Sequence, residues 1–326
     1  MTERRRFSDR EKAAIYAAAG ALIYDSIVSG STATSTAFDA RGGGVYTPDA
    51  LIVQDSTITG NSVTASGRGV GGGIQVGSYY GTNGGQASVK YSTLSGNQSS
   101  LWGGGAYFSG DASFTNSTAS GNGSCSGGGL YFFAGTTPNT VSMYSSTISG
   151  NTATCTGDGG GVQVDGEDLT VMDSTIAFNN ALNGNATKYG AGLHGFRVSN
   201  FDLENTIVAT NMTQLNGTDL EPDDIGGDST TTVTGAQNLV YFPDLVMPGG
   251  TILLTDPMLR ALASNGGPTA THMPNFGSPV IDAGNNVSGA TVDQRGTGYA
   301  RIIGPFPDIG SVEFTLVDEI FADGFD

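Results

Sequence analysis

The chain has 326 residues with 30 acidic and 13 basic side chains, which gives a formal net charge of −17 at pH 7. A surface with this charge repels nucleic acid and anionic membranes, so we expect neither as a partner. The chain contains 52 glycines, but they do not follow the Gly-X-Y repeat of collagen. Because residues that favour helices are also few, this composition favours short strands joined by tight turns.

The N-terminal end joins a basic segment to an apolar stretch, a pattern typical of an export signal. Residues 1–12 hold five of the 13 bases, and AAIYAAAGALIYDSIVSGS follows at 13–31. Residues 15–31 of this stretch align without a gap on residues 45–61, so that Ile15 falls on Val45. We therefore predict a coil of a repeat at 13–31, after a basic segment or short lid over 1–12. We also expect that upstream coils and a signal peptide have been lost. No transmembrane segment is expected further along.

Two short signatures alternate over residues 42–211. The first is a glycine triplet with an apolar residue after it: GGGVY (42–46), GGGIQ (71–75), GGGAY (103–107), GGGLY (127–131), GGGVQ (159–163) and GAGLH (190–194). The second is a strand that ends in asparagine: DSTITGN (55–61), YSTLSGN (91–97), NSTASGN (116–122), SSTISGN (145–151), DSTIAFN (173–179) and ENTIVATN (204–211). The interval varies between 24 and 36 residues, and the variation falls in segments with the composition of loops.

This repeat predicts an all-β fold, a right-handed parallel β-helix (β-solenoid) of about seven coils over residues 13–215. When the copies of the second signature are aligned, one position holds an apolar column from Ile58 to Ile207, and the position before it holds a threonine column from Thr57 to Thr206. Because side chains alternate along a strand, one column faces the core and the other faces out. The terminal asparagines are expected to form a hydrogen-bonded ladder. They are Asn61, Asn97, Asn122, Asn151, Asn179 and Asn211.

The residues after the glycine triplets form another column, which we expect on the outer surface. Aromatic, amide and carboxylate groups suit a glycan, because rings stack on sugar faces and polar groups bind hydroxyls. The candidate binding residues are Tyr107, Tyr131, Phe133, Gln163, Asp165, His194 and Phe196. The alternative interpretation is a side-chain ladder that only stabilises the sheet.

The two cysteines, Cys125 and Cys155, lie one repeat apart, each between the asparagine of one coil and the next glycine triplet. Stacked coils would bring their Cα atoms within disulfide range. We predict a disulfide that joins adjacent coils, as suits an exported protein. Two buried thiols are the alternative.

An enzyme built on a β-helix, either a polysaccharide lyase or a glycoside hydrolase, is the alternative function. The chain has only three lysines to serve as the base of a lyase. A hydrolase needs paired carboxylates at a controlled separation. The densest acidic group in the coils is Asp158, Asp165, Glu167, Asp168 and Asp173. Because turn chemistry explains VDGEDLT (164–170) within this group as a solvated turn between strands, we assign no catalytic residue.

One segment is a candidate for Ca²⁺, and otherwise no cofactor is expected. EPDDIGGD (221–228) offers four carboxylates, those of Glu221, Asp223, Asp224 and Asp228. Their spacing is not that of an EF-hand, and an acidic loop leaving the last coil is the alternative.

The repeats resemble those of polymorphic outer-membrane proteins and related bacterial β-helices. Downstream, three stretches resemble the choice-of-anchor Q domain: LTDPMLRALASNGGPTATHMPNFGSPVIDAGNN (254–286), VDQRG (292–296) and PDIGSVE (307–313). This resemblance implies a bacterial protein that is secreted or displayed at the cell surface, and it implies no defined reaction.

The C-terminal part is expected to be a cap. An irregular, β-rich region over 216–315 would cover the end of the coils, and an acidic tail over 316–326 would follow. In the cap, Arg295 and Arg301 are expected to pair with carboxylates, and the candidates are Asp282, Asp293 and Asp308. Together the patterns favour a monomeric, adhesin-like, non-enzymatic protein that binds a glycan or another cell-surface ligand.

Overall fold

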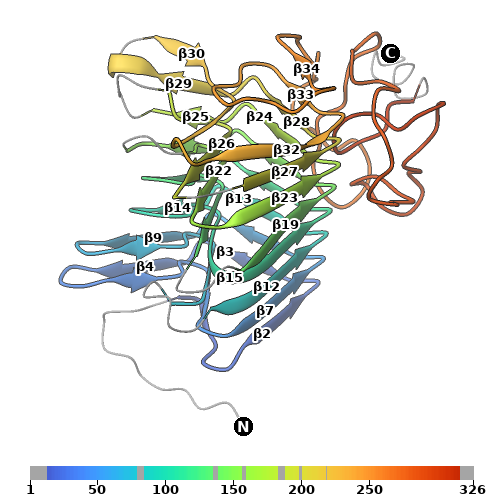
Figure 1. The fold of residues 1–326 in the computed structure, drawn as a ribbon. Helices are drawn as coiled ribbons and strands as arrows, with labels where there is room; N and C mark the ends of the chain where they lie inside the picture. The colour runs from blue at the N-terminus through green and yellow to red at the C-terminus, as the bar shows by residue number, and fades with distance from the viewer. Residues whose placement is uncertain are drawn as a thin grey trace, which may run out of the picture.

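The computed structural model describes residues 13–78, 84–134, 139–155, 159–182, 188–197, 200–217 and 219–315. The predicted segments 1–12 and 316–326 therefore lie outside the described residues, as does Asp158. The predicted fold class is confirmed, because parallel strands stack into an all-β solenoid of about seven turns (Figure 1).

Each turn of the solenoid contributes a strand to four faces, which we name A to D in chain order. Face A follows the glycine triplets: β1 (Ile15–Tyr16), β6 (Val45–Thr47), β11 (Ile74–Val76), β15 (Ala106–Thr115), β18 (Leu130–Phe133), β22 (Val162–Asp165), β26 (Leu193–Phe196) and β31 (Ile225–Gly227). Face B comes next: β2 (Ala21–Tyr24), β7 (Ala50–Gln54), β12 (Gly85–Lys90), the second half of β15, β19 (Thr140–Tyr144), β23 (Asp168–Met172), β27 (Asn200–Glu204) and β32 (Thr232–Ala236).

Faces C and D complete the turn. Face C carries the threonine signature: β3 (Ile27–Ser29), β8 (Thr57–Thr59), β13 (Thr93–Ser95), β16 (Thr118–Ser120), β20 (Thr147–Ser149), β24 (Thr175–Ala177), β28 (Ile207–Ala209), β33 (Leu239–Val240) and β34 (Ile252–Leu253). Face D holds β4 (Thr32–Ser35), β9 (Ser62–Ala65), β14 (Gln98–Ser99), β17 (Gly123–Ser124), β21 (Thr152–Ala153), β25 (Asn180–Ala181) and β29 (Met212–Gln214), a 3-10 turn (Leu215–Gly217) and the antiparallel β30 (Leu220–Pro222). From face D, the short return strands β5 (Ala40–Arg41) and β10 (Gly69–Val70) lead back to face A.

The register of the first coil agrees with the sequence alignment, since Ile15 pairs with Val45 across β1 and β6. One column is shifted in the last full coil. Ile207, which the sequence placed in the apolar inner column, pairs with Thr175 of the outer column. The last signature is one residue longer than the others, and its register is fixed at the asparagine end rather than at the serine–threonine end.

The asparagine ladder is present and it is buried along its whole length. Each side-chain amide nitrogen donates to the Oδ1 atom of the next coil over 2.8 to 3.0 Å, from Asn61 up to Asn211. A second hydrogen bond goes to a backbone carbonyl of the preceding coil; Asn151, for example, donates to Ala119 over 2.9 Å. Every amide is therefore satisfied inside the core, as buried polar groups require.

The glycine triplets make room for this ladder. A Cβ atom added at Gly129, the third glycine of its triplet, would lie 2.6 Å from the carbonyl oxygen of Gly161 and 3.0 Å from Nδ2 of Asn151. A Cβ atom at the middle glycine, Gly104, would lie 2.4 Å from two backbone oxygens. Both positions exclude any side chain because successive coils approach too closely.

The ladder ends on a carboxylate, and the chain then closes the end of the solenoid. Asp224 accepts from Asn211 Nδ2 over 2.8 Å and from the Phe242 N–H over 2.7 Å. Beyond it, Leu245 and Met247 pack against the main core cluster. The parallel stack therefore continues past the predicted limit at residue 215, through β31, β32 and β33.

The rest of the C-terminal region lies along the flank of the solenoid rather than over its end (Figure 1). It contacts the outer hydroxyls of face C: Thr118 donates to the carbonyl of Ala270 over 2.6 Å, and Thr147 donates to Gln294 Oε1 over 2.6 Å. The prediction of a cap over residues 216–315 therefore fits only the part of this region up to β34. The outward threonine column explains the difference, because it offers a hydroxyl for hydrogen bonding on each coil from Thr57 to Thr175.

Buried ion pairs hold this flanking region in place. Arg295 pairs with Asp293 over 2.6 Å, and Asp293 is one of the partners expected for it from the sequence. Arg301 pairs instead with Asp173 of the solenoid over 3.0 Å and with Glu313 over 3.3 Å, while it reaches Asp308 only through its backbone carbonyl. The prediction was wrong for Arg301 because its partner lies 128 residues away in the chain.

Replacing Asn151 by alanine is expected to destabilise the solenoid by roughly 3 kcal/mol, because the two buried N–H donors of Asn122 and the buried Ala119 carbonyl lose their hydrogen bonds to it. Urea unfolding followed by circular dichroism would measure this loss. Asn180→Ala, at a half-buried position just outside the ladder, is the matched control and should cost much less. Equal losses for the two variants would contradict a special role for the ladder.

Stability should fall as the pH rises. Burial raises the pKa of Asp224 to about 7, although its hydrogen bonds favour the charged form, and burial also raises the pKa of Glu313 to about 7. Because both carboxyl groups have a higher pKa in the folded chain than in the unfolded chain, their contribution to the free energy of unfolding is complete below about pH 4. This contribution is lost as the pH rises through 7. We expect the melting temperature to be at least roughly 3 °C lower at pH 8 than at pH 5.5. A higher value at pH 8 would refute this assignment.

Candidate functional site

The predicted binding column exists as a column, but most of it is not open to solvent. Tyr107 pairs with Tyr131, which pairs with Gln163, which pairs with His194. These four side chains and Asp165 are buried, and Tyr107 is 0% exposed. Of the seven candidates, only Phe196 (46% exposed) and the half-buried Phe133 reach the surface. The expected open patch is therefore corrected to a largely covered one.

The cover comes from the segments that return from face D to face A. Trp102 lies with its ring centroid 5.5 Å from that of Tyr131 and 6.3 Å from that of Tyr107, and Val70 joins the same cluster. Short parallel bridges link Val70 to Trp102 and Trp102 to Ser126. The return segments thus stack like the coils themselves and lie over the outer side of face A.

The polar members of the column are engaged with one another. Asp165 accepts hydrogen bonds from the Tyr131 hydroxyl over 3.2 Å and from the Arg197 guanidinium. Burial lowers the pKa of His194 to about 4, so its ring is neutral and its Nδ1 lies 2.7 Å from Gln163 Oε1. This closed network is what a stabilising ladder predicts.

The acidic segment proposed for Ca²⁺ does not converge on one point. Asp223 accepts from the backbone N–H groups of Tyr189 and Gly190, and Asp224 ends the asparagine ladder. Glu221 lies 3.6 Å from the Lys188 ammonium. Asp228, the fourth candidate, accepts from the Arg197 N–H. Within the described part of the chain, no group of three or more His, Cys, Asp or Glu residues could hold a metal ion.

The acidic group considered for hydrolysis is also dispersed. Asp165 lies on face A, and Asp173 pairs with Arg301 beneath the flanking region. Glu167 is buried and accepts from both the backbone and the side chain of Asn139, while burial raises its pKa. The interpretation as a solvated turn was therefore wrong for Asp165 and Glu167, because both carboxylates are buried and hydrogen-bonded near the corner between faces A and B.

A groove lies on the outer side of face B. It has a volume of about 390 Å³ and crosses β7, β12, β15 and β19, so it runs parallel to the axis of the solenoid. Along its floor one outward side chain from each coil pairs in register with the next, an isoleucine followed by three serines: Ile52, Ser88, Ser113 and Ser142. Its other lining residues are Ala50, Leu51, Gln86, Ala87, Asp111, Ala112 and Thr140.

The surface of the groove is mainly apolar, with several hydroxyl groups and one negative charge. Asp111 is its one charged lining residue, and no lysine or arginine lines it. Ser113 donates to the Ser88 hydroxyl over 3.3 Å, which places two hydroxyls of adjacent coils within reach of the same ligand group. Such a surface offers hydrogen bonds along the axis at the strand spacing of about 4.8 Å.

The sequence carried a signal for this groove that we did not use. The three serines of the floor each stand four residues before the serine at the second position of the asparagine-ended signature, as Ser113 does before Ser117. Alignment of the strand that precedes the signature would have found the column. The concavity itself depends on how face B curves, which residue spacing does not specify.

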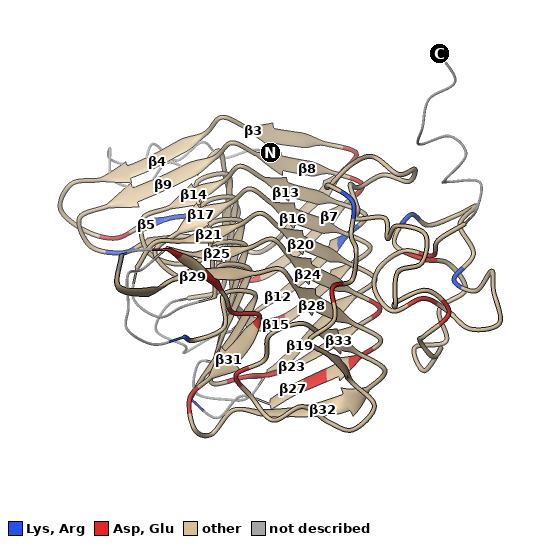
Figure 2. Cartoon of the chain, turned by 90° about the horizontal axis from the view of Figure 1, so that it is seen from above, with Lys and Arg blue, Asp and Glu red and all other residues tan. Residues whose placement is uncertain are grey.

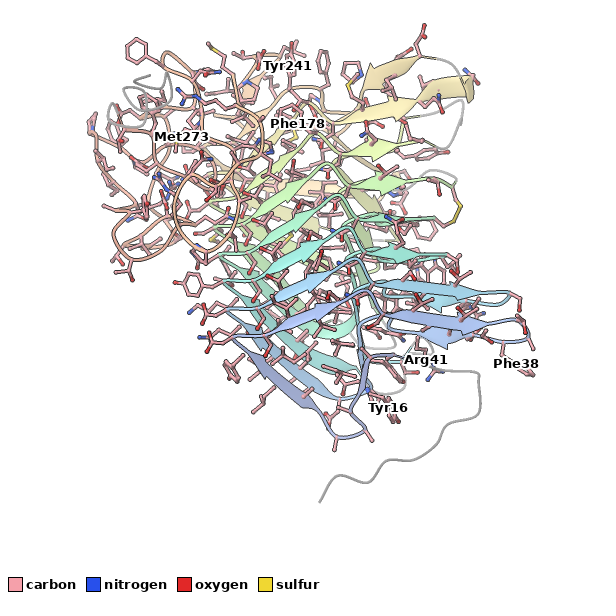
Figure 3. All side chains as sticks on the ribbon, turned by 180° about the vertical axis from the view of Figure 1, so that it is seen from behind. Tyr16, Phe38, Arg41, Phe178, Tyr241 and Met273 are labelled. Carbon is pink, nitrogen blue, oxygen red and sulfur yellow. A yellow bond between two sulfur atoms is a disulfide. The ribbon has the colours of Figure 1, made fainter. Side chains whose placement is uncertain are left out.

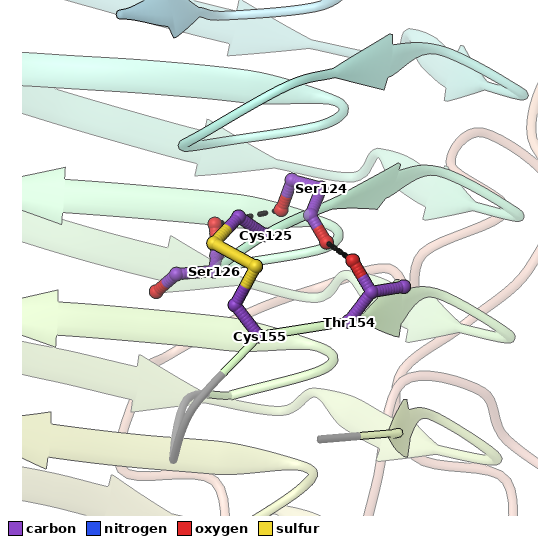
Figure 4. The surroundings of a disulfide bond; sticks show 5 residues. All are labelled: Ser124, Cys125, Ser126, Thr154 and Cys155. Carbon is purple, nitrogen blue, oxygen red and sulfur yellow. Dashed lines mark hydrogen bonds between the residues drawn. A yellow bond between two sulfur atoms is a disulfide. The ribbon is translucent and has the colours of Figure 1, made fainter.

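The disulfide that the cysteine spacing predicted is present between the two adjacent coils (Figure 4). The Cα atoms of Cys125 and Cys155 lie 4.6 Å apart, and the Cys155 N–H donates to the Cys125 carbonyl over 3.0 Å. Thr154 also donates to the Ser124 carbonyl beside it over 3.1 Å. The bond therefore reinforces a stretch of chain where face D turns back.

No family model, curated protein or solved structure matches this chain. None of the described residues forms a helix with the length and hydropathy needed to cross a membrane.

Reduction of the disulfide is expected to lower the free energy of unfolding by about 3 to 4 kcal/mol, because the bond closes a loop of 30 residues in the unfolded chain. Urea unfolding with and without reductant would measure the difference. A variant with both Cys125→Ser and Cys155→Ser should respond to the reductant not at all. Two free thiols titrated in the native, unreduced protein would contradict the bond.

Proposed function

We propose that this chain is a secreted or surface-displayed, adhesin-like protein that binds polysaccharide in the groove of face B. The observation that carries the proposal is the groove itself, with a serine from each of three successive coils along its floor. The aromatic column that the sequence singled out is left with a structural role, apart from its exposed end at Phe196.

The shape of the groove favours an extended chain of sugars over a compact ligand. It crosses four successive strands, and three of its floor residues present hydroxyls in register. An extended glycan repeats its hydroxyls at a spacing close to that of the strands, so each coil can bind one sugar in the same way. Ile52 adds an apolar position against which a sugar face can pack.

The charge of the chain favours an uncharged or cationic glycan over a polyuronate. Residues 13–326 carry 27 acids and 8 bases, a net charge of −19, and the groove contributes Asp111. An anionic polymer would meet repulsion from both. A neutral glucan or xylan, or a polymer of glucosamine, meets none from the lining residues.

Two features support export. A disulfide between adjacent coils persists in an oxidising compartment and is rare in the cytosol. The resemblance of residues 254–313 to the choice-of-anchor Q domain points the same way, toward display at the cell surface.

Filling the groove should abolish binding. We expect Ser113→Trp to weaken binding to a neutral or cationic polysaccharide at least tenfold, because the indole would occupy the floor. Thr64→Trp, at an exposed position of β9 on face D, is the matched control and should bind as the unaltered chain does. Affinity electrophoresis in gels with cellulose derivatives, xylan, chitosan or polygalacturonate would measure binding.

Each outcome of this experiment bears on the proposal. Failure to bind any of the polymers, or binding that Ser113→Trp leaves intact, would refute the groove as the site. Preference for polygalacturonate would refute the charge argument. New reducing or unsaturated ends on the polymer would establish the enzymatic alternative instead of binding alone.

A further inference from the structure

Two aspartates occupy the same position on the outer side of face B, two coils apart. In the register of β15 with β19 and of β19 with β23, Asp111 is followed in its column by Thr140 and then by Asp168. All three residues are exposed. Asp111 and Thr140 line the groove, and Asp168 extends the same column by one coil. At the spacing of parallel strands, the two aspartates lie roughly 10 Å apart.

The two carboxylates are held in the same way. Asp111 Oδ1 accepts from the Thr140 N–H over 2.8 Å, and Asp168 Oδ1 accepts from the Asn200 N–H over 2.9 Å. Each side chain is therefore fixed by the backbone of the following coil. None of the described residues donates to the Oδ2 atom of either aspartate. The pair thus repeats one orientation at an interval of two coils, with an acceptor left for a ligand.

The cations of the chain do not neutralise this pair. Among the described residues, no salt bridge includes either aspartate. Lys90 is the only lysine or arginine on the strands of face B. It lies four residues along β12 from Gln86, the column neighbour of Asp111, which is roughly 13 Å. Arg41, labelled in Figure 3, donates to the Tyr46 hydroxyl of face A over 2.9 Å.

Further carboxylates strengthen the negative potential beside the groove. Burial raises the pKa of Glu167, and the charges of Asp111 and Asp168 raise it further, so both aspartates lie close enough to act on it. Figure 2 shows the acidic residues of β23 and β27 in red. Such a potential attracts cations to this part of face B.

The separation of the two aspartates favours two separate positive charges over one metal ion. Ca²⁺ binds its oxygen ligands at about 2.3 to 2.6 Å, so two carboxylates roughly 10 Å apart cannot share one ion. They can bind two ammonium groups that a single extended molecule presents at that interval, because an ammonium donates strong hydrogen bonds to a carboxylate.

A β-1,4-linked chain of glucosamine has the required repeat. In an extended chain with this linkage each sugar is turned over relative to the one before it, so every second ammonium group points to the same side. With one sugar on each coil, these ammonium groups meet Asp111 and Asp168. The amino group of the sugar between them points away from Thr140. Ser113 and Ser142, two residues further along their strands, offer hydroxyls to the same sugars.

We propose that Asp111 and Asp168 select a β-1,4-linked polymer of glucosamine, in which the ammonium group of every second sugar binds one aspartate. The inference rests on the proposed function, and it narrows the ligand of the groove from neutral and cationic glycans to this one class.

Calorimetric titration at low ionic strength with two hexasaccharides of the same linkage tests the selection. The glucosamine hexasaccharide should bind about fivefold more tightly than the glucose hexasaccharide, as two exposed ion pairs allow. The double variant Asp111→Asn and Asp168→Asn should bind the two equally. Asp219→Asn with Asp256→Asn, two exposed residues outside face B, removes the same charge and is the matched control. It should keep the preference.

Each outcome decides between this inference and the groove itself. Equal affinity of the unaltered chain for the two hexasaccharides would overturn the selection and leave the groove as a binding site. A preference that survives in the Asp111 and Asp168 variant, or disappears in the control, would equally overturn it. Oligolysine of the same charge that binds as tightly would show attraction of any polycation instead. Binding of neither hexasaccharide would refute the groove and the selection together.

Discussion

The buried asparagine ladder, with the glycines packed against it, is the constraint on which the rest of the structure depends. An amide in the core must satisfy both of its polar atoms, and here each does so with the amide of the next coil. That geometry holds only if the facing backbone comes as close as it does at Gly129, where a Cβ atom has no space. The loops can vary in length because they lie outside this pair of columns. The register of every sheet follows from the contact between the asparagine ladder and these glycines.

The outer faces of the solenoid are not equivalent, and the difference decides where a ligand can bind. Return segments with Trp102 cover face A, and the C-terminal region covers face C from Thr118 onward. Face B remains open along the coils that carry Ser88, Ser113 and Ser142. The candidate site on face B therefore depends on the covering of faces A and C as much as on the residues of face B itself.

The sequence was sufficient for the coils, and it was insufficient for what packs upon them. Repeated signatures predicted the parallel stack, the ladder and the disulfide, because each depends on residues one repeat apart. They predicted that Tyr107 points outward, which is true, and that it is exposed, which is not. Whether an outward side chain meets water depends on segments that pack from elsewhere, such as the loop with Trp102. The shift at Ile207 had a different cause: one extra residue in the signature, absorbed before Asn211.

The C-terminal region along face C changes how the solenoid bears a load. In a simple repeat stack each coil contacts only its neighbours, so a pull at one end peels the coils off one at a time. Here the segment that ends at Thr315 is joined to several coils at once, through Thr118, Thr147 and Asp173. A force applied at that end is shared among these contacts in shear. Among the described residues, the hydrogen bonds between the coils and this region begin at Asn116, so the coils upstream are the part where fraying can start.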